Sequence, residues 1–270
     1  MERVADLLSK KTGIHLAERK LALVENRLTR LSGKIGYKGG FEELVSLIES
    51  GHHEEEFINA FTTNLTSFFR ESAQFDDFLG RFLKEYGHQK PSLSILCAGC
   101  SSGEEPYSAG ICYLHAKNEG IYNGVAKITA VDIDSEKLTA AKTGEYQMPH
   151  KNPFPLWVKE GSFFEIKDDN GHKKIFIKEN LKKIISFEKH NLASHSEQFK
   201  NSFYDAVFCR NTLIYFNKEK QLMILNKLLS ALKIGGTRYL GHSENPLELT
   251  AKLQKKGHNI YVKKGTEGEA

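Results

Sequence analysis

The sequence predicts an α/β fold, in which a doubly wound, mainly parallel sheet follows a small all-α domain and carries a small antiparallel β-insertion. Three observations support this. Apolar residues recur at helical spacing over residues 1–85, short apolar runs alternate with helical patterns from residue 93 onward, and the segment around Asp168-Asp169-Asn170-Gly171 has the composition of a hairpin. We therefore place a helical N-terminal domain and interdomain segment at residues 1–85, and a sheet domain at residues 86–270 with its insertion at about 155–183.

The first 85 residues are predicted to form a helical bundle. An apolar stripe runs from Val4 to Leu31 and stops at a glycine-rich turn over residues 33–40. Further amphipathic segments begin at Phe41 and Phe57, and helical spacing continues to Leu83. Residues 87–92 form a polar linker into the sheet domain.

The most informative stretch is residues 93–111, LSILCAGCSSGEEPYSAGI. A buried strand is expected to end at Gly99, a loop of small residues runs to Gly103, and a helix opens at Glu104-Glu105-Pro106, where proline suits the first helical position. Strand, glycine turn and helix start form the unit that binds nucleotide-like ligands in doubly wound sheets. An ordinary strand-to-helix turn is the alternative at this point.

The same loop indicates the kind of ligand. It has no lysine, and its two glutamates stand where a phosphate would meet the helix N-terminus. A pyrophosphate would be repelled there, whereas an adenosine compound with positive charge and no phosphate would be attracted. S-adenosylmethionine has these properties.

A second acid strengthens this interpretation. The apolar run that begins at Lys127 ends in Val131-Asp132-Ile133-Asp134. An acid at the end of the second strand of a βαβ unit accepts hydrogen bonds from ribose hydroxyls, although the spacing here exceeds the usual ~20 residues. Together the two signals predict a nucleoside-binding α/β domain.

The remaining elements follow from apolar runs and turn residues. The pattern predicts a helix at 136–142, an irregular segment at 146–155, the insertion, a return to the main sheet at 184–187, a buried strand at 204–209, a helix at 218–232 ended by Gly235-Gly236, strands at 237–241 and 259–262, and a disordered tail at 265–270.

Composition limits the functional classes. The chain has 270 residues and a net charge of +4, and no apolar run approaches the roughly 20 residues of a membrane span. It has no pattern typical of a signal peptide and no nucleic-acid-binding motif, so we expect a cytoplasmic protein without a nucleic-acid partner. Cys97 and Cys100 form a single CxxC, which indicates loop packing rather than a metal or redox site.

Six motifs together resemble the chemotaxis receptor methyltransferases of the CheR type. They are TNLTSFFRE at 63–71, AGCSSGEEPYS at 98–108, VDID at 131–134, HNL at 190–192, FCRNTLIYF at 208–216 and GHSEN at 241–245. The resemblance spans roughly residues 10–263. It implies a class I methyltransferase domain that transfers a methyl group from S-adenosylmethionine to receptor glutamates, giving methyl esters and S-adenosylhomocysteine, without a metal.

The resemblance also implies site residues, carried over motif by motif. Arg210 and Tyr215 match residues that face the substrate glutamate and the methyl group. Cofactor-binding residues by the same matching are Asn64, Thr66, Arg70, Glu105, Asp132, Asn191, Leu192, Asn211 and Thr212.

Each of these residues also has a structural interpretation. Tyr215 is compatible with a core position, Arg70 with a pair to Glu71 or Glu105, and Asn64 and Thr66 with helix caps. The proposed chemistry needs no general base, because a glutamate with a reference pKa of about 4.3 is already ionised near neutral pH. It needs alignment of carboxylate oxygen, methyl carbon and sulfur.

The resemblance further implies a partner, the cytoplasmic part of transmembrane chemoreceptors. Relatives dock a receptor C-terminal peptide as an added strand on the insertion, and the loop at 168–174 has a suitable length. Nine Lys/Arg against four acids in residues 1–40 indicate either a surface for acidic receptor helices or a solvated helix face. We expect a monomer recruited to receptor arrays. A methyltransferase with another substrate, a non-enzymatic adaptor and a nicotinamide dehydrogenase are the alternatives.

Overall fold

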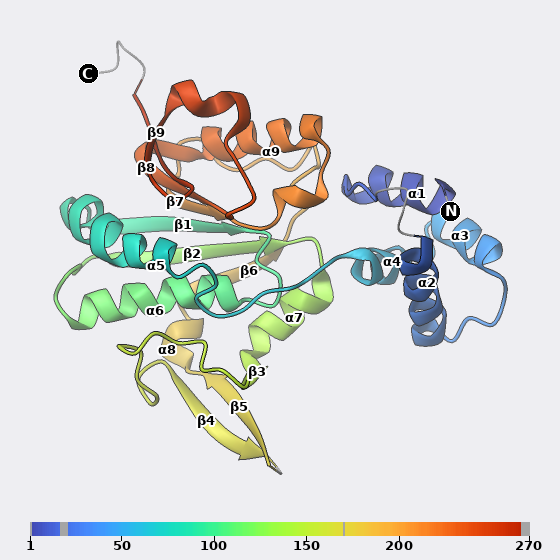
Figure 1. Ribbon diagram of the computed structural model, residues 1–270, viewed down its shortest axis with the longest axis horizontal. Coiled ribbons are helices and arrows are strands. Elements are labelled where there is room, and N and C mark those ends of the chain that lie inside the picture. The colour runs from blue at the N-terminus through green and yellow to red at the C-terminus, as the bar shows by residue number, and fades with distance from the viewer. Residues whose placement is uncertain (1, 17–20, 170, 266–270) are drawn as a thin grey trace.

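The computed structural model describes residues 2–16, 21–169 and 171–265. Four helices form the N-terminal domain: α1 (Glu2–Thr12), α2 (Leu21–Ile35), α3 (Phe41–Glu49) and α4 (Glu54–Phe61). Their apolar faces share a core that includes Leu8, Leu28, Leu44 and Phe57. Figure 1 shows these helices grouped beside the sheet domain, which confirms the predicted all-α domain.

The connection to the sheet domain begins with an irregular segment at 62–72. It is followed by α5 (Ala73–Asp77), the π-helix η1 (Phe78–Tyr86) and the 3-10 turn η2 (Gly87–Gln89). Phe78 packs against Phe208 and Tyr239 of the sheet. Residues 73–85, which the sequence analysis grouped with the helical domain, therefore pack as part of the sheet domain.

The main sheet has seven strands in the order β6-β2-β1-β7-β8-β10-β9. Their bounds are β1 (Ser92–Ala98), β2 (Val125–Asp132), β6 (Ile185–Lys189), β7 (Tyr204–Cys209), β8 (Leu232–Leu240), β9 (Leu253–Gly257) and β10 (Ile260–Lys263). The first five in the spatial order pair in parallel, and β10 is antiparallel to both its neighbours. This is the predicted doubly wound, mainly parallel sheet.

Both faces of the sheet are covered. Along β1, Ile95 and Cys97 belong to one apolar core, and Leu96 and Ala98 belong to the other, as the two-residue period of a strand requires. Helices α6 (Glu104–Asn118) and α7 (Ser135–Thr143) contribute to the first core, and α9 (Lys218–Ala231) contributes to the second. Figure 1 shows α6 and α9 on opposite sides of the strands.

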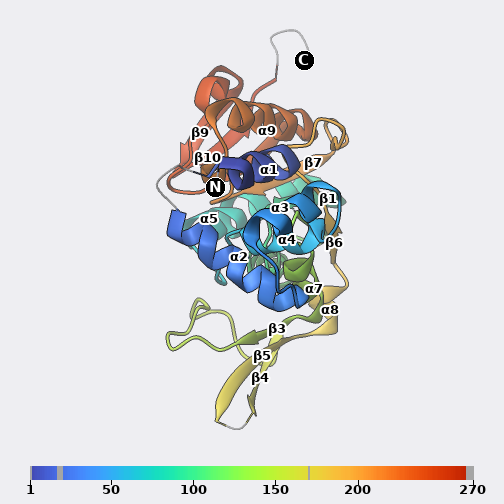
Figure 2. The same cartoon turned by 90° about the vertical axis from the view of Figure 1, so that its right-hand side faces the viewer.

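A second sheet has three antiparallel strands in the order β3-β5-β4. These are β3 (Glu145–Gln147), β4 (Phe164–Asp169) and β5 (His172–Ile177), and the short helix α8 (Glu179–Lys182) leads back to β6. Figure 2 shows this sheet projecting away from the main one. The predicted hairpin is confirmed. Strand β3 precedes residue 155, the predicted start of the insertion. It was not predicted, because a three-residue strand with one apolar residue between two polar ones shows no alternation of apolar and polar residues.

Two features near the C-terminus differ from the prediction. The polar strand β9 was not predicted. Helix α9 ends at Ala231, and Gly235-Gly236 lie inside β8, where Gly235 has a φ of 75°. The glycines therefore accommodate an irregular strand and do not end the helix. The predicted disordered tail lies almost wholly outside the described residues.

The part of the chain that the structure describes contains no helix long and apolar enough to span a membrane. All four cysteines are buried free thiols. Within the same ranges, no cluster of three or more histidine, cysteine or acidic side chains is arranged to hold a metal ion.

Candidate functional site

A cleft with an empty volume of about 900 Å³ opens at the carboxyl ends of β1, β2, β6 and β7. Ligands of doubly wound sheets bind at this edge. All eleven predicted site residues line the cleft, from five separate segments of the chain: Asn64, Thr66, Arg70, Glu105, Asp132, Asn191, Leu192, Arg210, Asn211, Thr212 and Tyr215. The end of α1 and the interdomain segment at 62–67 line it as well.

The glycine loop forms the floor of the cleft. Gly99 and Gly103 have φ values of 81° and 96°, which L-residues rarely adopt. A Cβ on Gly99 would lie 2.3 Å from Thr212 Oγ1, so the glycine permits close approach of two strand ends. Helix α6 begins at Glu104. Pro106 is therefore its third residue and not its first, a position that still belongs to the turn whose N–H groups lack helical partners.

The two acids after β2 have different structural roles. Asp132 accepts hydrogen bonds from the backbone N–H of Ser101, at 2.7 Å, and of Asp134, at 3.0 Å. Burial raises the pKa of Asp132. Asp134 caps α7 through the N–H of Lys137. Asp132 is therefore the acid that faces the cleft, as predicted, and Asp134 is a structural residue to which the sequence analysis gave no role.

Asn64 connects the interdomain segment to the glycine loop. Its Nδ2 donates to Asp134 Oδ2 at 2.8 Å and to Thr62 Oγ1 at 3.0 Å, and its Oδ1 accepts from Ser101 Oγ at 3.1 Å. The alternative that Asn64 caps a helix is therefore wrong. Thr66 lies farther along the same wall of the cleft.

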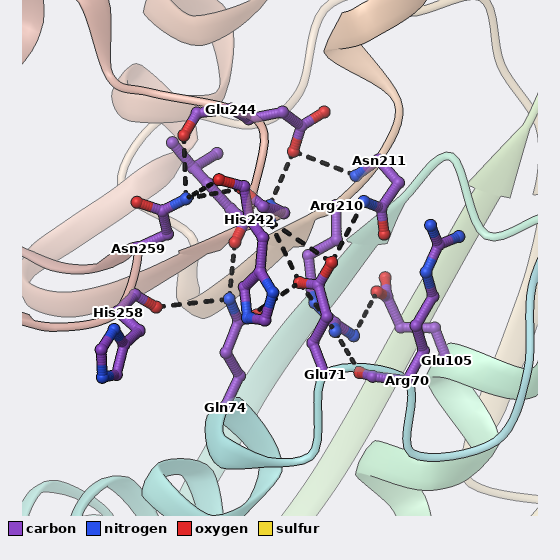
Figure 3. A network of polar contacts seen from close by, with 12 residues as sticks. Arg70, Glu71, Gln74, Glu105, Arg210, Asn211, His242, Glu244, His258 and Asn259 are labelled. Atoms are coloured by element: carbon purple, nitrogen blue, oxygen red, sulfur yellow. Dashed lines mark hydrogen bonds and ion pairs between the residues drawn. The ribbon is translucent and has the colours of Figure 1, made fainter.

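Arg210 is clamped between two carboxylates (Figure 3). Its Nη1 lies 3.1 Å from Glu105 Oε2 and its Nη2 lies 3.4 Å from Glu71 Oε2, and Nη2 also donates to the carbonyl of Arg70. Only 2% of the Arg210 side chain is exposed. Arg70 instead donates to the carbonyl of Leu65 at 2.6 Å. The ion pairs with Glu71 and Glu105, which the sequence analysis considered for Arg70, are made by Arg210.

Glu105 has one oxygen that the chain leaves unused. Its Oε1 is buried and has no hydrogen-bond partner among the described residues. Burial raises the pKa of Glu105 to about 7, against the lowering effect of Arg210. A buried carboxylate oxygen of this kind is costly unless a ligand supplies a donor or a positive charge. The site therefore fits a cationic ligand group at Glu105.

The turn after β7 is held by a carboxylate that the sequence analysis missed. Glu244 accepts hydrogen bonds from the backbone N–H group of Asn211 (Figure 3) and from those of Thr212 and Leu213. Glu71 Oε1 accepts from Asn211 Nδ2 at 3.2 Å. The motif containing Glu244 was recognised, but no local pattern indicates a contact that spans two strands.

The wall of the cleft that follows β6 is also fixed by hydrogen bonds. Asn191 Nδ2 donates to the carbonyl of Lys11 at 3.1 Å, which joins α1 to the sheet domain. Leu192 is buried, and its carbonyl accepts from Lys227 Nζ, which also donates to the carbonyls of Ser194 and Glu197. The sequence offered no signal for this role of Lys227.

Tyr215 lies at the junction with the helical domain. Its carbonyl accepts from the backbone N–H of His15 at 2.8 Å, and its half-buried side chain lines the cleft with Thr12 and Ile14. Burial raises the pKa of the Tyr215 hydroxyl, so this group stays protonated near neutral pH. The helical domain thus forms part of the site.

Comparison with known proteins agrees with this geometry. The family model described as "CheR methyltransferase, SAM binding domain" matches residues 64–262, and "CheR methyltransferase, all-alpha domain" matches residues 1–66. Chemotaxis protein methyltransferase 2 of Pseudomonas aeruginosa is 33% identical over 261 residues, which cover 96% of this chain and 91% of that protein. The chemotaxis protein methyltransferase of Escherichia coli is 33% identical, with coverage of 96% and 89%. That of Borreliella burgdorferi is 34% identical, with coverage of 90% and 87%.

Proposed function

Because the chain belongs to the CheR methyltransferase family, and is thus an S-adenosylmethionine-dependent methyltransferase of chemotaxis, we propose that it methylates glutamate side chains of transmembrane chemoreceptors. The observation that carries this proposal is the single cleft in which all eleven predicted residues meet. The products are a glutamyl methyl ester and S-adenosylhomocysteine. The protein acts in the cytoplasm, as a monomer recruited to receptor arrays.

The residues present fit the cofactor. S-adenosylmethionine supplies a methyl group activated on a positively charged sulfur. The unused oxygen of Glu105 suits its ammonium group, and the carboxylate of Asp132 suits the ribose hydroxyls. By the family resemblance, Asn191, Leu192, Asn211 and Thr212 surround the adenine and methionine ends of the cofactor, and Asn64, Thr66 and Arg70 line the same cleft.

Charge next to the cleft supports an acidic substrate. A groove between α2, α4 and α7 is lined by Arg27, Arg30, Lys34 and Lys137, against Glu56 and Glu136, and it shares Thr62 and Asn64 with the cleft. Positive charge beside the entrance attracts and orients an acidic helix.

Only some of the lysine and arginine residues in the basic block, residues 1–40, line this groove. Lys11 pairs with Glu54 at 2.7 Å and is mostly buried. Lys34 pairs with Glu136, and Arg27 donates to the carbonyl of Phe61 and to Thr63 Oγ1. Arg19 and Lys20 lie outside the described residues. The surface that we propose for the receptor is therefore narrower than the basic block of residues 1–40.

The reaction requires alignment more than proton transfer. The substrate glutamate arrives ionised, and the cleft must exclude water and hold its oxygen in line with the methyl carbon and the sulfur. Tyr215, which stays protonated, donates to this carboxylate or contacts the methyl group. Arg210 reaches the carboxylate by exchanging its longer pair, the 3.4 Å contact with Glu71, while it keeps Glu105 in place.

The small sheet provides a second contact for the receptor. Among the described strands, β4 pairs with β5 alone. The first part of its other edge is used within the chain, because Gly161 N–H donates to the carbonyl of Phe164 and Ile166 N–H donates to Glu160 Oε1, so the edge offered to a peptide strand is the part of β4 after Ile166. We propose that a C-terminal receptor peptide adds to this edge and raises the effective concentration of the methylation sites.

The test is transfer of radiolabelled methyl from S-adenosylmethionine to membranes that carry cognate chemoreceptors, followed by mild alkali. We expect label that alkali releases as methanol, and loss of transfer in Arg210→Ala. Membranes without receptors are the control. Alkali-stable label would indicate a nitrogen acceptor, and absence of label with intact cofactor binding would reject the proposed substrate.

A further inference from the structure

We propose that Glu244 is a positioning residue, whose carboxylate fixes the turn that carries Arg210 and Tyr215 by binding the backbone N–H groups of that turn. The inference rests on the proposed function for its catalytic consequence. Its structural basis is independent of the substrate.

The carboxylate of Glu244 is fully engaged. Oε1 accepts from the N–H groups of Thr212, at 2.8 Å, and Leu213, at 2.7 Å. Oε2 accepts from those of Asn211, at 3.0 Å, and Gly241, at 2.7 Å. Only 6% of Glu244 is exposed. Four charge-assisted bonds in a buried place determine a single geometry for the turn.

The turn has an uncommon backbone conformation that depends on its hydrogen bonds. Asn211 has a φ of 55°, in the left-handed region that asparagine adopts more readily than most non-glycine residues. The N–H groups just beyond β7 also lack strand partners, so in the absence of a carboxylate they would be buried without acceptors. Glu244 accepts hydrogen bonds from them and thereby stabilises this left-handed turn.

The surroundings hold Glu244 itself in place. Asn259 Nδ2 donates to the carbonyls of Gly241, His242 and Glu244. A Cβ on Gly241 would lie 2.6 Å from the backbone nitrogen of Asn211, so the segment after β8 approaches the turn as closely as glycine allows. Figure 3 shows these groups converging around the Arg210 pairs.

The decisive variant is Glu244→Gln. Glutamine keeps one acceptor oxygen and turns an NH2 group toward two of the N–H donors, so the turn must shift. A displacement of about 1 Å near the reacting groups lowers kcat by about 10²-fold. Cofactor affinity is expected to fall less than kcat, because Asp132 lies outside the turn and is held by the backbone N–H groups of Ser101 and Asp134.

Asp205→Asn provides a matched control. Asp205 is also a fully buried carboxylate on this sheet, and it accepts from the N–H of Ser94, Tyr86 Oη and Lys233 Nζ. It lies at the opposite end of β7 from Arg210. Its loss destabilises the fold without moving the turn.

Two measurements are made below the unfolding midpoints of both variants: kcat for receptor methylation, and hydrogen exchange of the peptide spanning residues 208–216. We expect Glu244→Gln to lower kcat and to accelerate exchange at 211–213, while Asp205→Asn changes neither more than about twofold. If Glu244→Gln does not fold, Gly241→Ala displaces the same turn and must give the same pattern.

Equal kcat values and equal exchange in the two variants would overturn the positioning role. A different result would show that the proposed function is wrong: the wild-type protein would bind S-adenosylhomocysteine but transfer no methyl group to receptors. The hydrogen-exchange comparison of the two variants would still test whether Glu244 fixes the turn.

Discussion

Affinity for the cofactor product should depend on the ionisation of Glu105. Burial raises the pKa of this carboxyl to about 7, and its unpartnered Oε1 is the group we assign to the ligand ammonium. The ionised form binds the cation and the protonated form does not. Affinity is therefore greatest above pH 7 and declines as pH falls through that value.

The size of the effect follows from the pKa. About nine tenths of Glu105 is ionised at pH 8 and about one tenth at pH 6, so the apparent Kd for S-adenosylhomocysteine rises roughly tenfold over this range. The assay is isothermal titration calorimetry at pH 6, 7 and 8. Glu105→Gln removes the charge, so it should bind more weakly at pH 8 and show little dependence on pH.

Glu104→Gln is the matched control. Glu104 is the neighbouring residue of the same helical turn, its pKa is also raised by burial, and it bonds to Ser102 Oγ at 2.8 Å. Since Glu104 does not line the cleft, this variant should keep the tenfold change. A wild-type Kd that is constant from pH 8 to pH 6, or a change that persists in Glu105→Gln, would refute the reasoning.

Three further variants test other parts of the structure. Arg238→Met should raise the free energy of unfolding, measured in urea, by about 1–3 kcal/mol, because Nε and Nη2 of Arg238 are buried without partners among the described residues; a lower unfolding midpoint would contradict this. Lys227→Met should weaken S-adenosylhomocysteine binding about tenfold by releasing three loop carbonyls, whereas the exposed Lys218→Met should not, and equal calorimetric affinities would count against it. Gly13→Ala places a Cβ 2.4 Å from Ala193 Cβ at a φ of 78°, so limited proteolysis should detect a looser contact between the domains, and an unchanged cleavage rate would refute a tight contact there.

The sequence predicted the parts of the fold that have local signals. The run from β1 to α6 combines an apolar strand, two glycines and a helix start within one short stretch, and each of these has a direct physical cause. An acid at the end of the second strand was predicted for the same reason, and the resemblance then selected Asp132 rather than Asp134. The resemblance then supplied residues such as Arg70 and Tyr215, which no periodicity distinguishes from structural positions.

What the sequence missed depends on contacts between distant segments. The strands β3 and β9 are short and polar, so pairing with a neighbour, and not their own composition, makes them strands. The pairs of Arg210 with Glu71 and Glu105 join three separate motifs, and motif order does not reveal which arginine takes which carboxylate. The role of Glu244 depends on the proximity of the ends of β7 and β8, which only the folded sheet creates.

The most direct test of glutamate methylation is to locate the methyl group on the acceptor. A purified chemoreceptor cytoplasmic domain is incubated with this protein and S-adenosylmethionine, and its peptides are then sequenced by tandem mass spectrometry. We expect single methyl additions on glutamate side chains that depend on Glu105 and Arg210. Methylation confined to lysine or arginine, or an unmodified receptor in the presence of a protein that binds the cofactor, would contradict it.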